Sequence, residues 1–452
     1  MTQGTISAGD TAWVLVSSAL VLLMTVGLAF FYGGLVRPKN ALNTMMMSVV
    51  ALGVIGVQWM LFGYSIAFGP GNPWFGGLSW FGLNHVGLDP NPTYSGTIPL
   101  QAHAMFQGMF AIITPALISG AIVERMRFRG YVVFLILWAT LIYDPLAHWV
   151  WGSGGWLLKR GALDFAGGTV VHISAGVSAL VAAWFLGPRR DYRRVPIAPH
   201  NVPLVLLGAG LLWFGWFGFN AGSALAANGL AALAFVNTNT AAAAALVTWA
   251  GLDLIRTGKV TAVGAATGLV VGLVGITPAA GYVTPLAGLA IGVLAAGVSY
   301  TAIQIRSRTK LDDALDVFSC HGMAGIAGAL LTGVFATKLV NPAGGDGLLA
   351  GNAGQMGVQL LAIVATVAIA ALGTLGILAL VQATIGARAD LAEENAGLDL
   401  SQHGEEAYLG TDLGTLAGSG GSLGGSVVVE SFGRPVARGA EVRAVGERSV
   451  LR

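Results

Sequence analysis

Residues 164–181 read DFAGGTVVHISAGVSALV. The stretch is apolar enough for a membrane helix, yet it begins with Asp164 and has His172 inside it. A second stretch, 321-HGMAGIAGALL-331, repeats the pattern His-x-x-Ala-Gly followed by Val or Ile. Ionisable side chains inside membrane helices cost roughly 2.5–3.5 kcal/mol on insertion scales, so they are hypotheses of function by default. The two stretches therefore predict two related membrane helices, each with a functional histidine.

The composition predicts a membrane protein. Charged residues are 10% of the 452 residues and the mean hydropathy is +0.74, whereas soluble domains have about 25% charged residues. The 67 glycines favour closely packed helices. A single cysteine, Cys320, excludes an intrachain disulfide, and the net charge of +2 gives no reason to expect nucleic acid as a partner. The first basic residue, Arg37, follows the first apolar run, so we expect a retained first helix.

Eleven segments are candidates for membrane spans, which need roughly 20 apolar residues each. They lie at about 12–35, 42–68, 100–123, 131–152, 166–187, 202–220, 231–255, 260–276, 284–305, 314–334 and 355–386. Lys and Arg are concentrated in the loops after the odd-numbered spans, whereas the opposite loops have Lys159, Arg160 and Lys338. Because cytoplasmic loops carry the excess of these residues, we expect a multi-pass protein of the cell membrane with its N-terminus outside and its C-terminus in the cytoplasm.

The end of the chain differs in character from the spans. We therefore expect two parts, a transmembrane domain over 1–387 and a cytoplasmic tail over 388–452. A Gly/Ser run, 417-AGSGGSLGGS-426, divides the tail. The composition predicts order in 387–415 and disorder beyond about residue 415.

The two histidine stretches indicate an internal repeat. His172 lies in the fifth span and His321 in the tenth, and aligning them pairs Gly176 with Gly325. Five spans separate the copies, and an odd repeat length inverts the second copy relative to the membrane. The predicted fold is all-α, with eleven transmembrane helices arranged as a 5+5 inverted repeat plus a final helix. We expect both histidines to face a shared central pore, neutral, with one ring nitrogen donating to the other.

Few ionisable groups fall within the expected spans, and we identify five: Asp144, Asp164, His172, Asp316 and His321. Asp164 begins its span, where a carboxylate can cap free backbone N–H groups. Two histidines without a third ligand make a poor zinc site, so no metal is expected. The sequence also lacks a nucleophile with a convincing base, which argues against an enzyme.

Aromatic residues form a second group, in 105-MFQGMF-110, 149-WVWG-152 and 213-WFGWFGFNAGS-223. Aromatic side chains near span ends are usually interface belts. The alternative is a cation site, because ring faces attract a cation by about 0.5–2 kcal/mol. The hydroxyl of Ser223 can accept a hydrogen bond from such a cation.

Several motifs together resemble one family. They are 161-GALDFAGGTVVHISAG-176, 213-WFGWFGFNAGS-223, 31-FYGGLVRPKN-40, 234-AFVNT-238, 276-ITPAAGY-282 and 316-DVFSCHG-322. With them the chain resembles the ammonium transporter (Amt/Mep/Rh) family, bacterial or archaeal Amt type. The resemblance runs from about residue 12 to the motif 397-GLDLSQHGEEAY-408.

The resemblance implies a homotrimer with one hydrophobic pore per subunit. It implies ammonium or ammonia as substrate, methylammonium as an analogue, no cofactor, and a cytoplasmic PII-type regulator. It also implies an outer substrate site, a phenyl gate, a pair of pore histidines and their pore neighbours. These are Phe106, Phe110, Trp151, Ser223 and Asp164 for the site, Phe110 and Phe219 for the gate, His172 and His321 for the pair, and Trp216, Tyr32 and Thr277 as neighbours.

The physics of the substrate predicts the mechanism. A bare ion in an apolar medium costs tens of kcal/mol, whereas neutral ammonia crosses more cheaply. We therefore expect ammonium to bind outside, lose its proton near the gate and pass as ammonia, which excludes potassium. The resemblance favours electrogenic transport. Two rivals are a water or glycerol channel, which predicts a pair of Asn-Pro-Ala motifs that the sequence lacks, and an ammonium sensor coupled to a PII-type protein.

Overall fold

The structure, a computed structural model, describes residues 4–408, so the predicted disorder beyond about residue 415 lies outside the described residues. The regular secondary structure of the described part is helical apart from a small antiparallel hairpin, β1 (Pro90–Asn91) with β2 (Ser95–Pro99). The longer helices are α1 (Ala8–Leu35), α2 (Ala41–Gln58), α4 (Leu100–Ile122), α5 (Phe128–Trp138), α8 (Ser174–Leu186), α9 (Val202–Gly222), α10 (Gly229–Thr257), α11 (Ala262–Ile276), α12 (Pro285–Ser307), α13 (Ala324–Phe335) and α14 (Gly354–Thr384).

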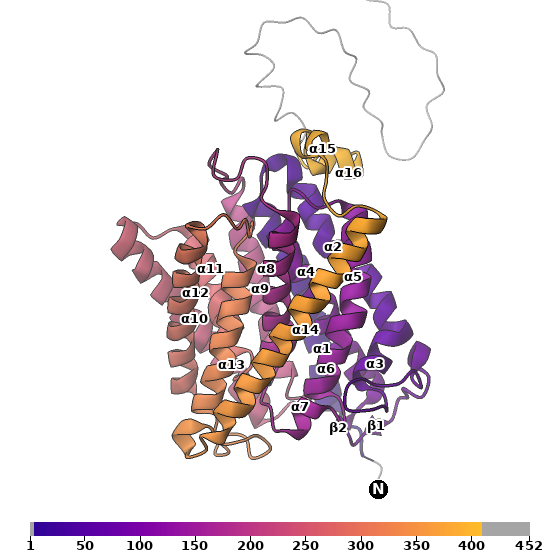
Figure 1. Ribbon diagram of the computed structural model, residues 1–452. Coiled ribbons are helices and arrows are strands. Elements are labelled where there is room, and N and C mark those ends of the chain that lie inside the picture. Colours follow the sequence, from indigo (N-terminus) through magenta and orange to yellow (C-terminus); the bar gives the residue numbers. More distant parts are fainter. Residues whose placement is uncertain (1–3, 409–452) are drawn as a thin grey trace, which may run out of the picture. The chain divides into compact units, whose positions relative to one another are not determined.

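Shorter helical elements extend or connect these helices (Figure 1). The short α-helices are α3 (Tyr64–Phe68), α6 (Asp144–Trp151), α7 (Trp156–Lys159), α15 (Leu391–Ala396) and α16 (Leu398–His403). The 3-10 turns are η1 (Pro38–Asn40), η3 (Phe81–Leu83) and η7 (Leu348–Ala350). Four π-helical segments are η2 (Trp59–Gly63), η4 (Ala139–Tyr143), η5 (Gly168–Ile173) and η6 (Phe318–Met323). Each π-helical segment runs directly into an α-helix, so it forms part of a continuous helical span.

A helix lies within each of the eleven segments predicted to span the membrane. Within residues 4–408, ten helical spans are long and apolar enough to cross a bilayer, which makes the chain a multi-pass membrane protein. The remaining one, α11, has 15 residues, fewer than the roughly 20 that a span perpendicular to the bilayer needs.

The tenth predicted span begins too early in the sequence analysis. Its helix starts at Phe318, and Asp316 precedes it with a left-handed backbone (φ 58°). The reason is a cap that the hydropathy pattern does not reveal: the Asp313 carboxylate accepts hydrogen bonds from the backbone N–H groups of Val317 (3.0 Å) and Phe318 (2.8 Å). Asp316 therefore lies before the helix, where it forms an ion pair with Arg306 (2.7 Å).

The five ionisable residues identified within the spans were an incomplete set. His103 in α4, His148 in α6 and Asp253 in α10 are also buried in helices. His103 is hydrogen-bonded to the Tyr64 hydroxyl (2.9 Å), and His148 binds the backbone carbonyl oxygens of Ala67 and Asn72. These contacts give both buried imidazoles hydrogen-bond partners inside the fold, as buried polar groups require.

The first helices of the two predicted repeat copies, α1 and α9, pack along each other. Glycines of α9 at positions 208, 215 and 218 lie directly against the backbone or side chains of α1. Small residues at such contacts let two membrane helices approach closely, which maximises van der Waals contact where lipid removes the hydrophobic driving force. In Figure 1, α14 runs obliquely across the bundle, and it contacts α5, α8 and α13.

Buried charges join four loops at one end of the bundle. We call Arg37, Glu124, Arg125, Arg189 and Asp312 the ion cluster. Arg189 is hydrogen-bonded to both carboxylate oxygens of Asp312 (2.9 Å each) and to Glu124 (3.0 Å), and Arg37 contacts the same Glu124 oxygen (3.0 Å). Burial raises the pKa of Glu124, but the guanidinium groups of Arg189 and Arg37 outweigh this effect and hold that pKa below its ordinary value.

Replacing Glu124 with glutamine should destabilise the fold by about 3 kcal/mol, because the buried guanidinium groups of Arg125 and Arg189 would then share a single carboxylate, that of Asp312. We expect a clearly lower melting temperature in detergent. Asp191→Asn is the matched control: Asp191 also pairs with Arg37 (2.8 Å), but its side chain is 39% exposed, so its loss should matter by less than about 1 kcal/mol. Equal losses in both variants would contradict the prediction.

The stabilisation by Glu124 should also depend on pH, and wild type and Glu124→Gln can be compared to test this. Folding lowers the pKa of Glu124, so this side chain makes its full contribution to the free energy of unfolding at pH values above its unfolded pKa of about 4.3. The contribution is lost as the pH falls through the lower folded value. The difference in melting temperature between wild type and Glu124→Gln should therefore be constant above about pH 5 and shrink below about pH 4.

The segment after α14 packs on the same end of the bundle as the ion cluster. The Asp399 carboxylate in α16 accepts hydrogen bonds from the N–H groups of Leu42 (3.0 Å) and Asn43 (2.7 Å) and so caps α2. The Lys39 ammonium donates to the carbonyl oxygens of Glu394 and Asn395. Lys39 follows the end of α1, so the start of α1 lies at the opposite end of the bundle. There the Ser7 N–H group donates to the Thr97 carbonyl oxygen of β2 (2.8 Å).

Candidate functional site

Rings from four helical elements form a continuous column inside the bundle. Phe106 and Phe110 of α4 lie edge to face (4.9 Å between ring centroids), and Phe110 lies against Phe219 of α9 at 4.2 Å. Phe219 stacks on His172 of η5 at 5.9 Å, and His172 stacks on His321 of η6 at 5.4 Å. The structure therefore brings the predicted gate and the predicted histidines into one line.

Trp151 and Ser223 lie at the phenylalanine end of the column. The Trp151 ring is perpendicular to Phe110, with a centroid distance of 6.1 Å. Ser223 follows the last turn of α9, and its hydroxyl donates to the Phe219 carbonyl oxygen (2.8 Å), which leaves the oxygen lone pairs available as acceptors. We call Phe106, Phe110, Trp151 and Ser223 the aromatic site.

The Asp164 carboxylate is occupied by hydrogen bonds from the residues that follow it. Its carboxylate accepts hydrogen bonds from four backbone N–H groups, those of Gly167, Gly168, Thr169 and Val170, at 2.6–3.2 Å. The Thr169 hydroxyl donates to it as well. The predicted capping role is thereby confirmed. A carboxylate has about four lone-pair sites, so these five donors leave no strong acceptor position on Asp164 for a substrate proton.

Asp164 also contacts the aromatic site through its backbone. The Trp151 indole N–H group donates to the Asp164 carbonyl oxygen (2.8 Å). This bond fixes the indole plane relative to the residue that caps η5. Asp164 and the aromatic site are therefore one connected structure, in which the carboxylate holds the helix start and the carbonyl oxygen holds the tryptophan.

The two histidines share a hydrogen bond. Their Nδ1 atoms are 3.3 Å apart and both rings are buried. In a neutral pair one Nδ1 atom donates and the other accepts, so one Nε2 atom carries a proton and the other does not. Among the described residues, His172 Nε2 has no hydrogen-bond partner. A neutral pair thus offers one donor and one acceptor to a small molecule beside it.

The close approach of the histidines depends on two glycines, each four residues after its histidine. A Cβ atom at Gly176 would lie 2.2 Å from the Gly322 nitrogen, and one at Gly325 would lie 3.1 Å from the His172 Cβ atom. Each glycine therefore lies against the segment that contains the other histidine. Both histidines also lie in π-helical segments, where the widened turn shifts the side chains relative to a regular helix.

Cavities continue the column on both sides of His321. A narrow cavity of about 10 Å³, enough for roughly one water-sized molecule, is lined by Phe219, His172, His321 and Tyr32. A wider one of about 280 Å³ is lined by Tyr32, His321, Cys320 and Asp316. Tyr32 is held by a bond from its hydroxyl to the Leu117 carbonyl oxygen (3.1 Å). Tyr32 and His321 therefore line both cavities, and the wider one extends to Asp316.

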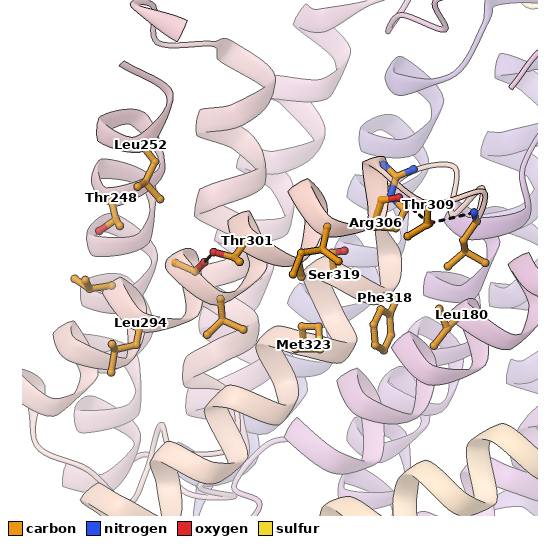
Figure 2. Close-up of a pocket in the computed structure, with 16 residues that line it drawn as sticks. Leu180, Thr248, Leu252, Leu294, Thr301, Arg306, Thr309, Phe318, Ser319 and Met323 are labelled. Atoms are coloured by element: carbon orange, nitrogen blue, oxygen red, sulfur yellow. Dashed lines mark hydrogen bonds between the residues drawn. The ribbon is translucent and has the colours of Figure 1, made fainter. Parts of the chain in front are cut away.

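The remaining predicted neighbours also lie beside the column. Trp216 stacks on His172 at 5.4 Å, and its indole N–H group donates to the Thr277 hydroxyl (2.9 Å). Thr277 thus contacts the column through Trp216. A larger cavity of about 880 Å³ lies elsewhere, between α10, α12 and η6, and its lining is mostly apolar (Figure 2). Thr248 and Leu252 line one side of it and Phe318 and Met323 the other, so it is separate from the column.

Sequence reasoning missed three residues next to the column. Asp313 lies eight residues before His321, as Asp164 lies eight before His172, and both cap a π-helical segment. Extending the repeat alignment backwards would have found it. Gln355 and Gln359 of α14 bind the chain just before Asp164. They were overlooked because only ionisable residues were sought in the spans. Within residues 4–408, no group of three His, Cys, Asp or Glu side chains could hold a metal ion.

Known proteins share this architecture and sequence. The family model described as Ammonium Transporter Family matches residues 12–408. An ammonium transporter of Bacillus subtilis (strain 168) is 50% identical over 401 residues, which cover 88% of this chain and 98% of the relative. The crystal structure of Candida albicans Mep2 superposes with a TM-score of 0.83 at 38% identity, covering 90% of this chain and 92% of that chain.

A further similar structure is described as a sensor Amt protein. It has a TM-score of 0.79 and 30% identity, and the match covers 87% of this chain and 98% of that chain. The residues matched by the family model include the column, the aromatic site and the helices around them. With a family match over nearly the whole described chain and relatives near half identity, this chain belongs to the ammonium transporter family.

Proposed function

We propose that this protein transports ammonium by binding the ion at the aromatic site, removing its proton and conducting ammonia past the two histidines. One observation carries the proposal: the Phe110–Phe219 ring pair adjoins a narrow, mostly apolar cavity of about 10 Å³, which Phe219 lines together with both members of the hydrogen-bonded histidine pair. A bare cation cannot cross such a passage without losing several kcal/mol or more of hydration. Neutral ammonia fits it and can form hydrogen bonds with the histidine nitrogens.

The proton that ammonium releases is proposed to pass to the ring nitrogens of the histidine pair and to cross apart from the ammonia molecule, which makes transport electrogenic. The histidine pair presents alternating donor and acceptor nitrogens, and such an arrangement can pass a proton along hydrogen bonds. Potassium has no proton to lose, so the apolar passage excludes it. Asp164 is proposed to act through its negative charge close to the aromatic site rather than as the base, because five donors already occupy its carboxylate.

The proposed membrane arrangement has eleven crossings, with α11 as the eighth, in a 5+5 inverted repeat. Two observations support it: the start of α1 and the pair α15–α16 lie at opposite ends of the bundle, which requires an odd number of crossings, and the Gly176 and Gly325 contacts are reciprocal. The excess of Lys and Arg places the ion cluster in the cytoplasm and the aromatic site outside. A homotrimer, a PII-type regulator and a domain boundary near residue 387 belong to the same proposal.

The test of this function is uptake of methylammonium into proteoliposomes with simultaneous recording of current. We expect saturable uptake, an inward current with ammonium, and no current with potassium. Uptake without current would contradict the electrogenic mechanism. The absence of any flux, with ammonium binding retained, would favour a second candidate, an ammonium sensor. That candidate is supported by the similarity to the sensor Amt structure over 98% of its chain.

The aromatic site gives a more specific prediction. Trp151→Leu keeps an apolar side chain but removes most of the attraction between ring and cation. A loss of about 1–2 kcal/mol should raise the half-saturation concentration for methylammonium roughly tenfold, with little change in maximal rate. The measurement is uptake against concentration. The control is Trp149→Leu, since Trp149 donates to the Trp74 carbonyl oxygen (2.7 Å) away from the column. An unchanged half-saturation concentration in Trp151→Leu would show that Trp151 belongs only to the aromatic belt at the membrane interface and does not bind the substrate.

A further inference from the structure

Gln359 of α14 makes a two-way connection with a single residue of another segment. Its side-chain oxygen accepts a hydrogen bond from the Leu163 N–H group (2.8 Å), and its side-chain nitrogen donates to the Leu163 carbonyl oxygen (2.8 Å). The same nitrogen donates to the Ala329 carbonyl oxygen of α13 (3.1 Å). Gln359 is 1% exposed. Its amide therefore pairs with the backbone of Leu163 as a neighbouring strand would.

Gln355, one turn earlier, continues the connection. Its side-chain nitrogen donates to the Gly161 carbonyl oxygen (3.0 Å) and to the Gln359 side-chain oxygen (3.3 Å). Residues 161–167 are not helical, so the Gly161 carbonyl oxygen and both backbone polar groups of Leu163 lack the partners that a regular helix would give them. Irregular backbone at membrane depth persists only where other parts of the protein satisfy it. The two glutamines supply those partners from the last long helix.

The connection leads directly to the aromatic site. Leu163, which Gln359 holds through both backbone polar groups, precedes Asp164. The Asp164 carbonyl oxygen accepts the indole N–H bond of Trp151 (2.8 Å), and the Asp164 carboxylate caps the segment that contains His172. A shift of Leu163 would therefore move the acceptor that orients the Trp151 ring.

We propose that Gln359 is a positioning residue for the aromatic site, and that it acts through Leu163 and Asp164 on the orientation of Trp151. Only the expected consequence, a change in apparent substrate affinity, rests on the proposed transport function. The final helix thus sets the geometry of a site to which it contributes no side chain. Ala329 is the third point of attachment, so the same amide fixes the segment before Asp164 relative to the helix that follows His321.

The decisive experiment is a double-mutant cycle with Gln359→Met and Trp151→Leu. Methionine keeps the length of the side chain and removes all its strong hydrogen bonds. We expect Gln359→Met to raise the half-saturation concentration for methylammonium about fivefold, with maximal uptake changed less than twofold. In the double variant, the half-saturation should equal that of Trp151→Leu alone, because the effect of Gln359 passes through Trp151. A merely structural role would not give this equality.

Thr366→Val is the matched control, because it also replaces a buried polar side chain of α14. Thr366 donates to the Ala362 carbonyl oxygen of its own helix (2.8 Å), so its loss should leave the half-saturation unchanged. If Gln359→Met does not assemble, Gln355→Met is the second variant. It removes the bond to Gly161 while retaining Gln359, and a rise of about twofold, absent in the Trp151→Leu background, is expected.

A second measurement is independent of transport. Hydrogen exchange of the peptide that contains Leu163 should be at least about tenfold faster in Gln359→Met than in wild type, because the N–H group loses its acceptor. Thr366→Val should exchange as wild type does. Multiplicative effects in the double-mutant cycle, or unchanged exchange at Leu163, would overturn the proposal. If wild type fails to transport, the transport function is wrong, whereas the exchange measurement still decides whether Gln359 fixes Leu163.

Discussion

Replacing His172 with aspartate is expected to preserve ammonium flux and to admit potassium, and replacing both histidines with alanine is expected to stop the proton-coupled current. The aspartate side chain is smaller than imidazole and negatively charged. It would widen a passage of about 10 Å³ and place an anion where the native pair is neutral. Both changes lower the barrier for a whole cation, since a fixed charge compensates part of the lost hydration.

The double alanine variant tests the other half of the mechanism. Alanine removes the Nδ1–Nδ1 hydrogen bond and every ring nitrogen at the centre of the column. Ammonia could still cross an apolar passage, but a proton would have no chain of donors and acceptors to follow. We therefore expect residual uptake without current. The ammonium-dependent current should fall to the detection limit of the electrical measurement.

Currents in ammonium and in potassium, recorded on the same reconstituted variants, measure both effects. Cys320→Ala is the matched control, because Cys320 is a buried neighbour of His321 in the same π-helical segment. It should behave as wild type. Full ammonium current with intact potassium exclusion in the double alanine variant would show that the histidines only fill space.

Replacing Asp164 with alanine is expected to abolish uptake. The substitution leaves four backbone N–H groups and the Thr169 hydroxyl without their acceptor in a buried segment. Each buried unsatisfied group costs about 1–3 kcal/mol, so the start of η5 should no longer hold its conformation. It also removes the negative charge that attracts a cation to the aromatic site.

Asp164→Asn separates the two roles. One side-chain oxygen remains and can still accept the N–H groups of Gly167 and Gly168, whereas the charge is lost. We expect an assembled protein with partial uptake. Melting temperature and uptake are measured on both variants, and Asp144→Asn is the control, because Asp144 is a buried carboxyl that binds Gln58 (2.7 Å) outside the column. Normal transport by Asp164→Ala would refute the proposed role.

The sequence alone was sufficient to predict the helical membrane fold and the composition of the column. Apolar segments separated by charged loops predict spans because the bilayer accepts little else. The spacing of His172 and Gly176, repeated in His321 and Gly325, indicates two related helices. Residues that carry charge in an apolar context are conspicuous, so the histidines and the capping aspartate could be named before any geometry was known. The particular aromatic residues of the column were named from the resemblance to the family.

Other features depended on contacts between segments far apart in the chain. Gln359 and Leu163 are 196 positions apart, and glutamine in an apolar helix gives no sign of its partner. The start of the tenth predicted span was likewise placed too early, so that it included Asp316. Hydropathy is averaged over a window and does not detect the cap that Asp313 forms.

Local patterns therefore determined which residues enter the membrane and which of them can hold charge or hydrogen bonds, because these depend on the transfer of each side chain from water to an apolar medium. Only the tertiary structure decided how those residues meet. The 3.3 Å contact of the histidines, the saturation of the Asp164 carboxylate and the hold of α14 on Leu163 each require a particular packing of helices. Packing depends on the shapes of all neighbours at once, and a linear sequence does not display them.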